Sequence, residues 1–381
     1  MLGVAVACQP PETPPSVPLG SPLHGLDETN TGRFRVGEAL FNRVFVPEDG
    51  LGPLFNDNQC SACHTVPATG GTGDQLVTRA SRTESDGRCN LLSEAGGENV
   101  RLQATPAMRA HGIEHQPMPA GATEQVRFNV PFVFGMGLLE AIPEKQILER
   151  ADPDDRDRDG ISGRPGRDTE GRFARFGRKA DQPTLRAFVE IAAHLEMGLT
   201  TPAHPKESVI EGLPFPEGVD PKPEPELTEA EVELLTDFVR FLAPPSQMPV
   251  ENEAERRLVE RGEELFRSVG CSGCHTPSMT TGRHPIKALS RKQVYLYSDL
   301  LLHDMGPDLA NVCAPGATRN EMRTEPLMGL GRRSLYLHDG RANDLTQAIL
   351  LHGGEASGVR ARFQALSEGQ KHALLRFLQS L

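Results

Sequence analysis

Apolar residues recur at helical spacing in four stretches of the chain, at residues 32–42, 228–242, 255–266 and 369–381. Spacings of three and four residues predict an amphipathic helix in each stretch. The first and third stretches share the sequence Gly-Glu-x-Leu-Phe, so the chain carries an internal repeat. We therefore expect two segments built on one plan, each opened and closed by one of these helices.

Between the first two predicted helices the pattern is less regular. Residues 70–130 are rich in Gly and polar residues, and only residues 126–130 alternate apolar and polar positions as a strand would. Residues 131–200 add a second long stretch of mixed character. We interpret both stretches as loop-rich insertions in the first segment.

Each early helix is followed by the sequence Cys-x-x-Cys-His, at residues 60–64 and 271–275. This is the attachment pattern of a c-type haem, in which two thiols bond to the porphyrin and the histidine binds the iron. The sequence therefore predicts two covalently bound haem c groups. Their cysteines would be Cys60, Cys63, Cys271 and Cys274, and their iron ligands His64 and His275.

A Cys-x-x-Cys pair has two other interpretations, a zinc site and a thioredoxin-type dithiol. A zinc site needs a second ligand pair at finger-like spacing, and none occurs. A thioredoxin-type dithiol needs a long helix directly after the motif, whereas Pro67 and Pro277 follow here. Haem attachment is the better interpretation.

The haem motifs define the expected fold class and domains. In cytochrome c folds the first and last helices pack together beside the haem. We expect a mostly α protein with two cytochrome c-like haem domains at residues 25–245 and 250–381, the first carrying the insertions. Residues 244–250 would form the linker.

Composition and the N-terminal sequence limit the expected binding partners and the cellular location. A net charge of −12 makes nucleic acid an unsuitable partner and permits a basic redox partner. Small residues precede Cys8, as at the end of a lipoprotein signal, and a Pro-rich tether follows it within residues 1–24. No apolar run of ~20 residues predicts a transmembrane helix. We expect a periplasmic or cell-envelope protein, attached to the membrane only through a lipid on Cys8.

Two cysteines lie outside the haem motifs and the predicted anchor. Covalent haem c is assembled outside the cytoplasm, where a disulfide between Cys89 and Cys313 is permissible. The sequence alone leaves open whether these residues form a disulfide or two free thiols.

A calcium site is a further candidate. Asp155, Asp157 and Asp159 occupy the first, third and fifth positions of a calcium-loop pattern, and Gly160 follows at the turn. The twelfth position, where a glutamate is usual, is Gly166. The alternative is a solvated acidic turn.

Five longer strings carry a family resemblance: FGMGLLEAIP at 134–143, DGISGR at 159–164, GRFARFGRKA at 171–180, YSDLLLHDMG at 297–306 and LHDGRA at 337–342. From about residue 30 onward the chain resembles the di-haem oxidoreductase family, whose members are also labelled peroxidases or thiol oxidoreductases. More remotely it is similar to bacterial di-haem cytochrome c peroxidases and MauG-like enzymes. The resemblance implies two unlike haems, one six-coordinate and relaying electrons, the other open to peroxide.

The resemblance makes the sixth iron ligands the central question. For the second haem we favour His352 among the candidates His303, Met305, Met322, Met328, His338 and His352. For the first haem no spacing is compelling among His111, His115, Met108, Met118, Met136 and Met197. By the same resemblance Glu140 is the candidate acid–base residue, with a helix-capping or ion-pairing glutamate as the alternative. Arg178 and Lys179 are candidates to bind haem propionates, or form a solvated basic turn.

The leading functional hypothesis is an extracytoplasmic di-haem oxidoreductase of peroxidase type. Electrons would come from a small cytochrome or cupredoxin, enter at the C-terminal haem and pass to the N-terminal haem. The alternative is an electron-transfer protein without substrate chemistry. A third hypothesis, a thiol oxidase using Cys89 or Cys313, rests on the family label.

Overall fold

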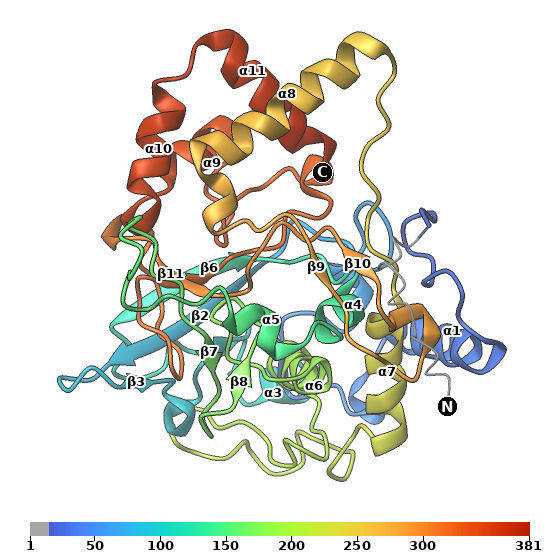
Figure 1. Ribbon diagram of the computed structural model, residues 1–381. Coiled ribbons are helices and arrows are strands. Elements are labelled where there is room, and N and C mark those ends of the chain that lie inside the picture. Colours follow the sequence, from blue (N-terminus) through green and yellow to red (C-terminus); the bar gives the residue numbers. More distant parts are fainter. Residues whose placement is uncertain (1–14) are drawn as a thin grey trace, which may run out of the picture.

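A computed structural model describes residues 15–381 of the chain (Figure 1). The helices are α1 (Glu28–Phe41), α2 (Cys60–Cys63), α3 (Pro106–Ala110), α4 (Met136–Glu140), α5 (Glu144–Leu148), α6 (Leu185–Met197), α7 (Glu229–Phe241), α8 (Glu253–Val269), α9 (Leu345–Leu351), α10 (Ser357–Gln364) and α11 (Glu368–Ser380). The strands are β1 (Leu54–Phe55), β2 (Leu76–Thr83), β3 (Cys89–Asn90), β4 (Asn99–Val100), β5 (Gln103–Ala104), β6 (Glu124–Asn129), β7 (Gly166–Arg167), β8 (Phe173–Ala174), β9 (Met279–Thr280), β10 (Gln293–Val294), β11 (Leu302–Asp304) and β12 (Glu321–Arg323).

The predicted fold class is confirmed in part. Helices hold about 34% of the residues and strands about 14%, so about half of the chain lies outside both. Helices outweigh strands, but the chain is not simply a mostly α protein. Short strand pairs and turns satisfy much of the backbone of the long insertions, which also contain α3 to α6.

The four predicted helices are present as α1, α7, α8 and α11. α1 packs on α7, and α8 packs on α11, which Figure 1 shows side by side at one end of the molecule. Local capping fixes where they begin: Asp27 and Asn252 cap the early helices through their side chains. Thr228 and Ser367 form full capping boxes at the later ones. The sequence therefore sets both helix pairs through local signals and apolar faces.

The repeated glycine explains how closely each pair packs. A Cβ on Gly37 would lie 2.1 Å from the carbonyl oxygen of Leu234 on α7. A Cβ on the equivalent Gly262 would lie 2.1 Å from the carbonyl oxygen of Ala373 on α11. No side chain fits at either crossing, because the two backbones touch there. The repeat in the sequence is thus a repeat in the packing.

The repeated phenylalanine links each helix pair to its Cys-x-x-Cys-His motif. Phe41 and Phe266 each contact an aromatic ring on the partner helix and the histidine of their own motif. The ring centroids are 4.7 Å apart for Phe41–Phe238, 6.0 Å for Phe41–His64, 5.4 Å for Phe266–Phe377 and 6.5 Å for Phe266–His275. Both motifs are therefore held in the same way against the same kind of helix pair.

A four-stranded sheet occupies the first insertion. β2 pairs antiparallel with β6, from Leu76 opposite Asn129 to Ser81 opposite Glu124, and also with β3 and β4. β6 covers most of the strand predicted at residues 126–130, so that prediction is confirmed. The sheet matters for function because β2 and β6 form one wall of the cavity described below.

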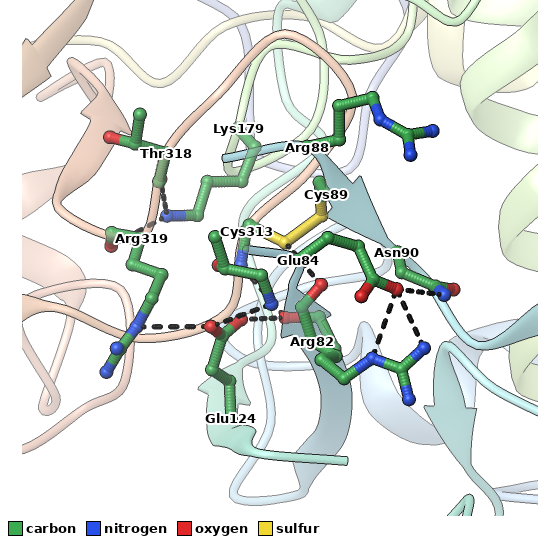
Figure 2. Close-up of a disulfide and its surroundings, with 12 residues drawn as sticks. Arg82, Glu84, Arg88, Cys89, Asn90, Glu124, Lys179, Cys313, Thr318 and Arg319 are labelled. Atoms are coloured by element: carbon green, nitrogen blue, oxygen red, sulfur yellow. Dashed lines mark hydrogen bonds and ion pairs between the residues drawn. A yellow bond between two sulfur atoms is a disulfide. The ribbon is translucent and has the colours of Figure 1, made fainter. Parts of the chain in front are cut away.

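A disulfide joins Cys89 on β3 to Cys313, 224 residues later (Figure 2). The backbone N–H of Cys313 also donates to the hydroxyl of Ser81 on β2, at 3.0 Å. The reading of Cys89 and Cys313 as two free thiols is therefore wrong. The bond ties the sheet of the first insertion to the C-terminal part of the chain.

We expect the C89S/C313S double variant to lose about 2–4 kcal/mol of unfolding free energy, because the disulfide restricts a long loop of the unfolded chain. Denaturant unfolding measures this, and dithiothreitol on the wild type is the matched control, since thioether bonds resist it. An unchanged midpoint would contradict the structural role. Lost turnover in a folded variant would instead support thiol chemistry.

In the described part of the chain, no helix is both long and apolar enough to cross a membrane. The predicted anchor residue, Cys8, lies outside the described residues, as does the first part of the Pro-rich tether.

Candidate haem sites

The first Cys-x-x-Cys-His motif opens onto a large cavity. α2 is a single helical turn, which brings the thiols of Cys60 and Cys63 to one side. Both cysteines and His64 line an empty space of about 1750 Å³, open mouth included. Much of the remaining lining is apolar, and includes Phe41, Val130, Met136, Phe188, Met197 and Val239. A large apolar cavity with convergent thiols suits a porphyrin.

The orientation of His64 fits an iron ligand. Its Nδ1 lies 3.0 Å from the carbonyl oxygen of Gly71, so Nδ1–H donates to that oxygen and orients the ring. Burial lowers the pKa of His64, which keeps the ring neutral. A ligating histidine needs this neutral form, oriented by a hydrogen bond at its other nitrogen.

The second motif repeats this geometry. Cys271 opens a short 3-10 turn, and Nδ1 of His275 lies 3.0 Å from the carbonyl oxygen of Tyr297. Burial lowers the pKa of His275 to about 4, so this ring is neutral too. Within residues 15–381, neither motif belongs to a group of side chains placed to hold a metal ion by themselves. The zinc reading gains no support, and both motifs fit haem attachment.

His352 resembles His275 in its hydrogen bonding and in its lowered pKa. It follows α9, and its Nδ1 lies 2.7 Å from the carbonyl oxygen of Ala348, which leaves Nε2 free. Burial lowers the pKa of His352. A positive charge on His352 would lower the pKa of His275, so the two side chains lie in the same region of the fold. Two neutral histidines are a ligand set of six-coordinate haem, and His352 stays the candidate sixth ligand.

His303 is held differently. Its Nε2 lies 2.9 Å from Asp299 and its Nδ1 lies 2.7 Å from Glu355. Burial alone would lower the pKa of His303, but hydrogen bonds to Asp299, Cys274 and Glu355 raise it to about 12. A protonated imidazole has no lone pair for iron. His303 is therefore an unsuitable sixth ligand, although it lies 3.6 Å from the sulfur of Cys274.

His338 also has both ring nitrogens engaged. Nε2 donates to the carbonyl oxygen of Arg323 at 3.0 Å, and Nδ1 lies 3.2 Å from a guanidinium nitrogen of Arg178. Burial lowers its pKa to about 3. Of the methionine candidates, Met305 and Met322 pack in one hydrophobic cluster and Met328 in another. His352 thus remains the candidate that the geometry favours.

The first cavity contrasts with the second site. His64 is the one histidine that lines it among the described residues. His111 and His115 are exposed, Met108 is buried in a separate cluster, and Met118 is exposed. The two methionines that do line the cavity are Met136 and Met197, and the sulfur of Met197 lies 3.7 Å from that of Cys60.

Ionisable groups form part of the cavity wall. Arg79 on β2 pairs with Glu98 at 3.2 Å and with Glu196 at 3.5 Å. Asp181 lines the same wall, and among residues 15–381 it forms no ion pair within 4.0 Å. Burial, together with the negative charge of Glu98, raises the pKa of Asp181 to about 6. A carboxyl group that titrates near neutral pH can both accept and donate a proton.

Sequence reasoning missed Asp181. It directly follows the string at residues 171–180 and carries no local pattern that distinguishes it from a solvated acid. Its raised pKa comes from burial and from the charge of Glu98, both of which only the fold supplies.

Glu140, the candidate acid–base residue, lies elsewhere. Its carboxylate accepts from the backbone N–H of Leu185 at the start of α6, at 2.8 Å. It also pairs with Arg240 of α7 at 3.2 Å. Glu140 is not among the residues that line the cavity. The geometry is that of a capping and ion-pairing glutamate.

The two candidates for binding haem propionates, Lys179 and Arg178, differ in their surroundings. Lys179 lines the cavity, but its ammonium donates to the carbonyl oxygens of Thr318 and Arg319, both at 3.1 Å (Figure 2), and of Glu321 at 2.7 Å. Burial lowers the pKa of Lys179 to about 7. This ammonium is already satisfied by backbone oxygens.

Arg178 belongs to a buried cluster around Glu325. Glu325 pairs with Arg178 at 3.1 Å, with Arg323 at 2.9 Å and with Arg333 at 3.5 Å. Three guanidinium groups share one carboxylate, so the cluster has surplus positive charge. Because Arg178 and Arg323 also line the cavity, they are placed to bind anions such as propionates.

The predicted calcium loop is compact. The carboxylates of Asp155, Asp157 and Asp159 offer oxygens within 4.8 Å of one another. Asp155 and Asp159 accept from the backbone N–H groups of Gly160 and Ile161, at 3.2 and 2.8 Å. The three side chains are brought together, and calcium at this loop stays a prediction.

Comparison with known proteins places the chain in a class. A sequence profile of the family described as "Di-haem oxidoreductase, putative peroxidase" matches residues 122–381. The chain therefore belongs to the di-haem oxidoreductase family, a family that implies haem cofactors. The matched region starts later than the resemblance in the sequence suggested, and the motif at residues 60–64 precedes it. No curated protein gives a significant match.

Three solved structures are similar to this chain. A hydrazine synthase of Kuenenia stuttgartiensis has 15% identity and a TM-score of 0.45, covering 100% of this chain and 98% of that chain. A MauG-like protein associated with microbial copper homeostasis has 15% identity and a TM-score of 0.41, covering 100% and 95%. The diheme peroxidase BthA of Burkholderia thailandensis has 14% identity and a TM-score of 0.44, covering 93% and 86%.

Proposed function

We propose that this protein is a peroxidase-type oxidoreductase with two covalent haem c groups. Cys60 and Cys63 hold one haem with His64 as iron ligand. Cys271 and Cys274 hold the other with His275. The family membership supports haem, and the matching hydrogen bonds of the two histidines support the two attachment sites.

One observation carries the proposal: the two sites are unlike. A second histidine, His352, is near His275, whereas the cavity at His64 is lined by no other histidine among the described residues. An iron with two strong protein ligands cannot bind peroxide, and an iron with one can. Peroxide is therefore reduced at the N-terminal site, and the C-terminal site passes electrons to it.

The residues of the cavity wall supply the proton chemistry. When bound, haem supplies the redox-active iron at which peroxide is reduced. Asp181 takes up a proton from peroxide and returns one to the oxygen that leaves as water. Arg79 holds Glu98 and Glu196 in ion pairs, whereas Asp181 forms none among the described residues and has a pKa raised to about 6. Arg178 and Arg323 bind the propionates.

The remaining parts of the proposal concern the setting. Residues 25–245 and 250–381 form the two haem domains, consistent with the separate helix pairs α1–α7 and α8–α11. The electron donor is a small cytochrome or cupredoxin. Covalent haem c and the disulfide suit a periplasmic or cell-envelope location. Asp155, Asp157 and Asp159 bind calcium, which D155N/D157N would abolish.

One observation favours the alternative function of a pure electron carrier. Met136 and Met197 line the first cavity, and a thioether bound to the iron would close that site. The protein would then hold two six-coordinate haems and consume no peroxide.

The C63S and C274S variants test the proposal. Each is expected to hold one haem per chain instead of two, because each lacks a thioether bond. With a reduced donor, the wild type consumes hydrogen peroxide and C63S does not. C89S is the matched control, since it removes a cysteine and leaves both haems in place. Two haems in both variants, or no peroxide consumption by the wild type, would contradict the proposal.

A further inference from the structure

Four carboxylates meet in the segment between α6 and α7, away from both haem motifs in the sequence. Glu207, Asp220, Glu224 and Glu226 each offer an oxygen, and these oxygens all lie within 4.8 Å of one another. Residues 199–228, which hold them, contain no helix or strand. No histidine or cysteine joins the group.

Three of these carboxylates have buried oxygens without a partner. Glu226 is only 1% exposed, and its Oε1 has no hydrogen-bond donor among the described residues. The same holds for Oε1 of Glu207 and Oδ2 of Asp220. Buried carboxylate oxygens in native proteins are normally satisfied, so three in one cluster require an explanation.

Thr200 satisfies only part of the cluster. Its hydroxyl lies in hydrogen-bond contact with both Glu224 and Glu226, but it has a single proton to donate. Its backbone N–H donates to Oε2 of Glu226 at 2.5 Å. The Oε1 of Glu226 is left buried without a donor among the described residues.

The neighbouring cations do not neutralise the cluster. Lys222 donates to the carbonyl oxygens of Asp49 at 2.9 Å and of Glu226 at 2.7 Å. Arg101, buried beside the segment, donates to backbone oxygens of Leu195 and His194. Within residues 15–381 none of the four carboxylates forms an ion pair with a basic side chain within 4.0 Å. Buried like charges without a counter-ion are costly.

We propose that Glu207, Asp220, Glu224 and Glu226 bind a divalent cation of the calcium class. An all-oxygen donor set selects a hard cation over zinc or copper. Irregular loops with several carboxylates suit calcium, which accepts six to eight oxygens in flexible geometry, better than magnesium.

The site would hold the loop to the cavity wall. Thr200 bonds to Glu226 and lies three residues after Met197, which lines the first cavity. The backbone N–H of Leu227, next to Glu226, donates to the carbonyl oxygen of Thr200 at 3.1 Å. A cation here would fix the end of α6 and the start of α7 relative to each other.

Calcium titration of the haem-loaded protein, after treatment with a chelator, tests the proposal. By calorimetry we expect a site that is weakened at least tenfold in both E226Q and E224Q, since each removes one charged ligand. Calcium should also raise the thermal midpoint of the wild type by more than that of E226Q, in which the loop at residues 155–159 is unchanged. The E226Q substitution is buried and could prevent folding. E224Q is the second variant because Glu224 is exposed, so its substitution should leave the fold intact.

The D155N/D157N variant is the matched control, because it removes two carboxylates from the other acidic loop. This variant is expected to keep the site that E226Q and E224Q lose. The proposal is overturned if the wild type binds no calcium. It is equally overturned if all of the binding disappears in D155N/D157N while folded E224Q and E226Q bind as the wild type does.

Discussion

Replacing Asp181 with asparagine is expected to slow peroxide reduction by about 10²–10⁴-fold, the usual contribution of a positioned acid–base group. The amide keeps the size and hydrogen-bonding capacity of the carboxylate but cannot carry a proton. Because burial raises the pKa of Asp181 to about 6, the group is largely ionised above that pH and protonated below it. The wild-type rate should therefore fall as the pH drops below about 6.

The pH profile separates a proton carrier from a structural residue. In D181N the decline below about pH 6 should disappear, and both haems should remain attached. E140Q is the matched control, since it makes the same change in a residue that caps α6 and pairs with Arg240. We expect E140Q to keep most of the turnover and to lose some stability. A large loss in E140Q with an unaffected D181N would return the acid–base role to Glu140.

Replacing His352 with alanine is expected to convert the second haem from low-spin to high-spin. The loss of one of two nitrogen ligands opens the iron that faces His275. Donor-supported peroxide turnover should fall strongly, because the electron relay is changed while the first cavity is not. Absorption and paramagnetic resonance spectra measure the spin state directly.

Two further variants define the role of His352. H352M should restore six ligands and raise the potential of this haem, because a methionine ligand favours the reduced iron. H111A is the control, since His111 is exposed and does not line the first cavity. A low-spin second haem that survives in H352A would exclude His352 as ligand.

Much of the fold could be predicted from local signals in the sequence. The four helices of the repeat follow from their apolar spacing and caps, and the repeated Gly-Glu-x-Leu-Phe marks the helix crossings at Gly37 and Gly262. The Cys-x-x-Cys-His motifs are equally local. Each of these features depends on residues close together in the chain, where spacing alone fixes the geometry.

Features that depend on distant contacts could not be predicted. Cys89 and Cys313 meet across 224 residues, and nothing in either neighbourhood selects the partner. Asp181 and Glu140 show the same limit in the candidate site. Glu140 stood out because of its family string, yet Arg240 and the start of α6 bind it. Asp181 acquires its raised pKa from burial and from Glu98.

The mostly α expectation was confirmed only in part, for a related reason. Helix periodicity is visible over a dozen residues, whereas two-residue strands such as β4 and β5 leave no pattern. Their pairing comes from satisfying backbone groups in long insertions once the chain has folded. The acidic cluster at Glu207 and Glu226 escaped notice in the same way, because its members are spread over 20 residues of irregular loop.

The most direct test of the unlike sites is a low-temperature electron paramagnetic resonance spectrum of the oxidised protein, repeated after peroxide is added to the mixed-valence form. We expect one high-spin signal from the N-terminal haem, which peroxide alters, and one low-spin signal from the haem between His275 and His352. Two low-spin signals that do not respond to peroxide would contradict the proposed peroxidase chemistry and identify an electron carrier.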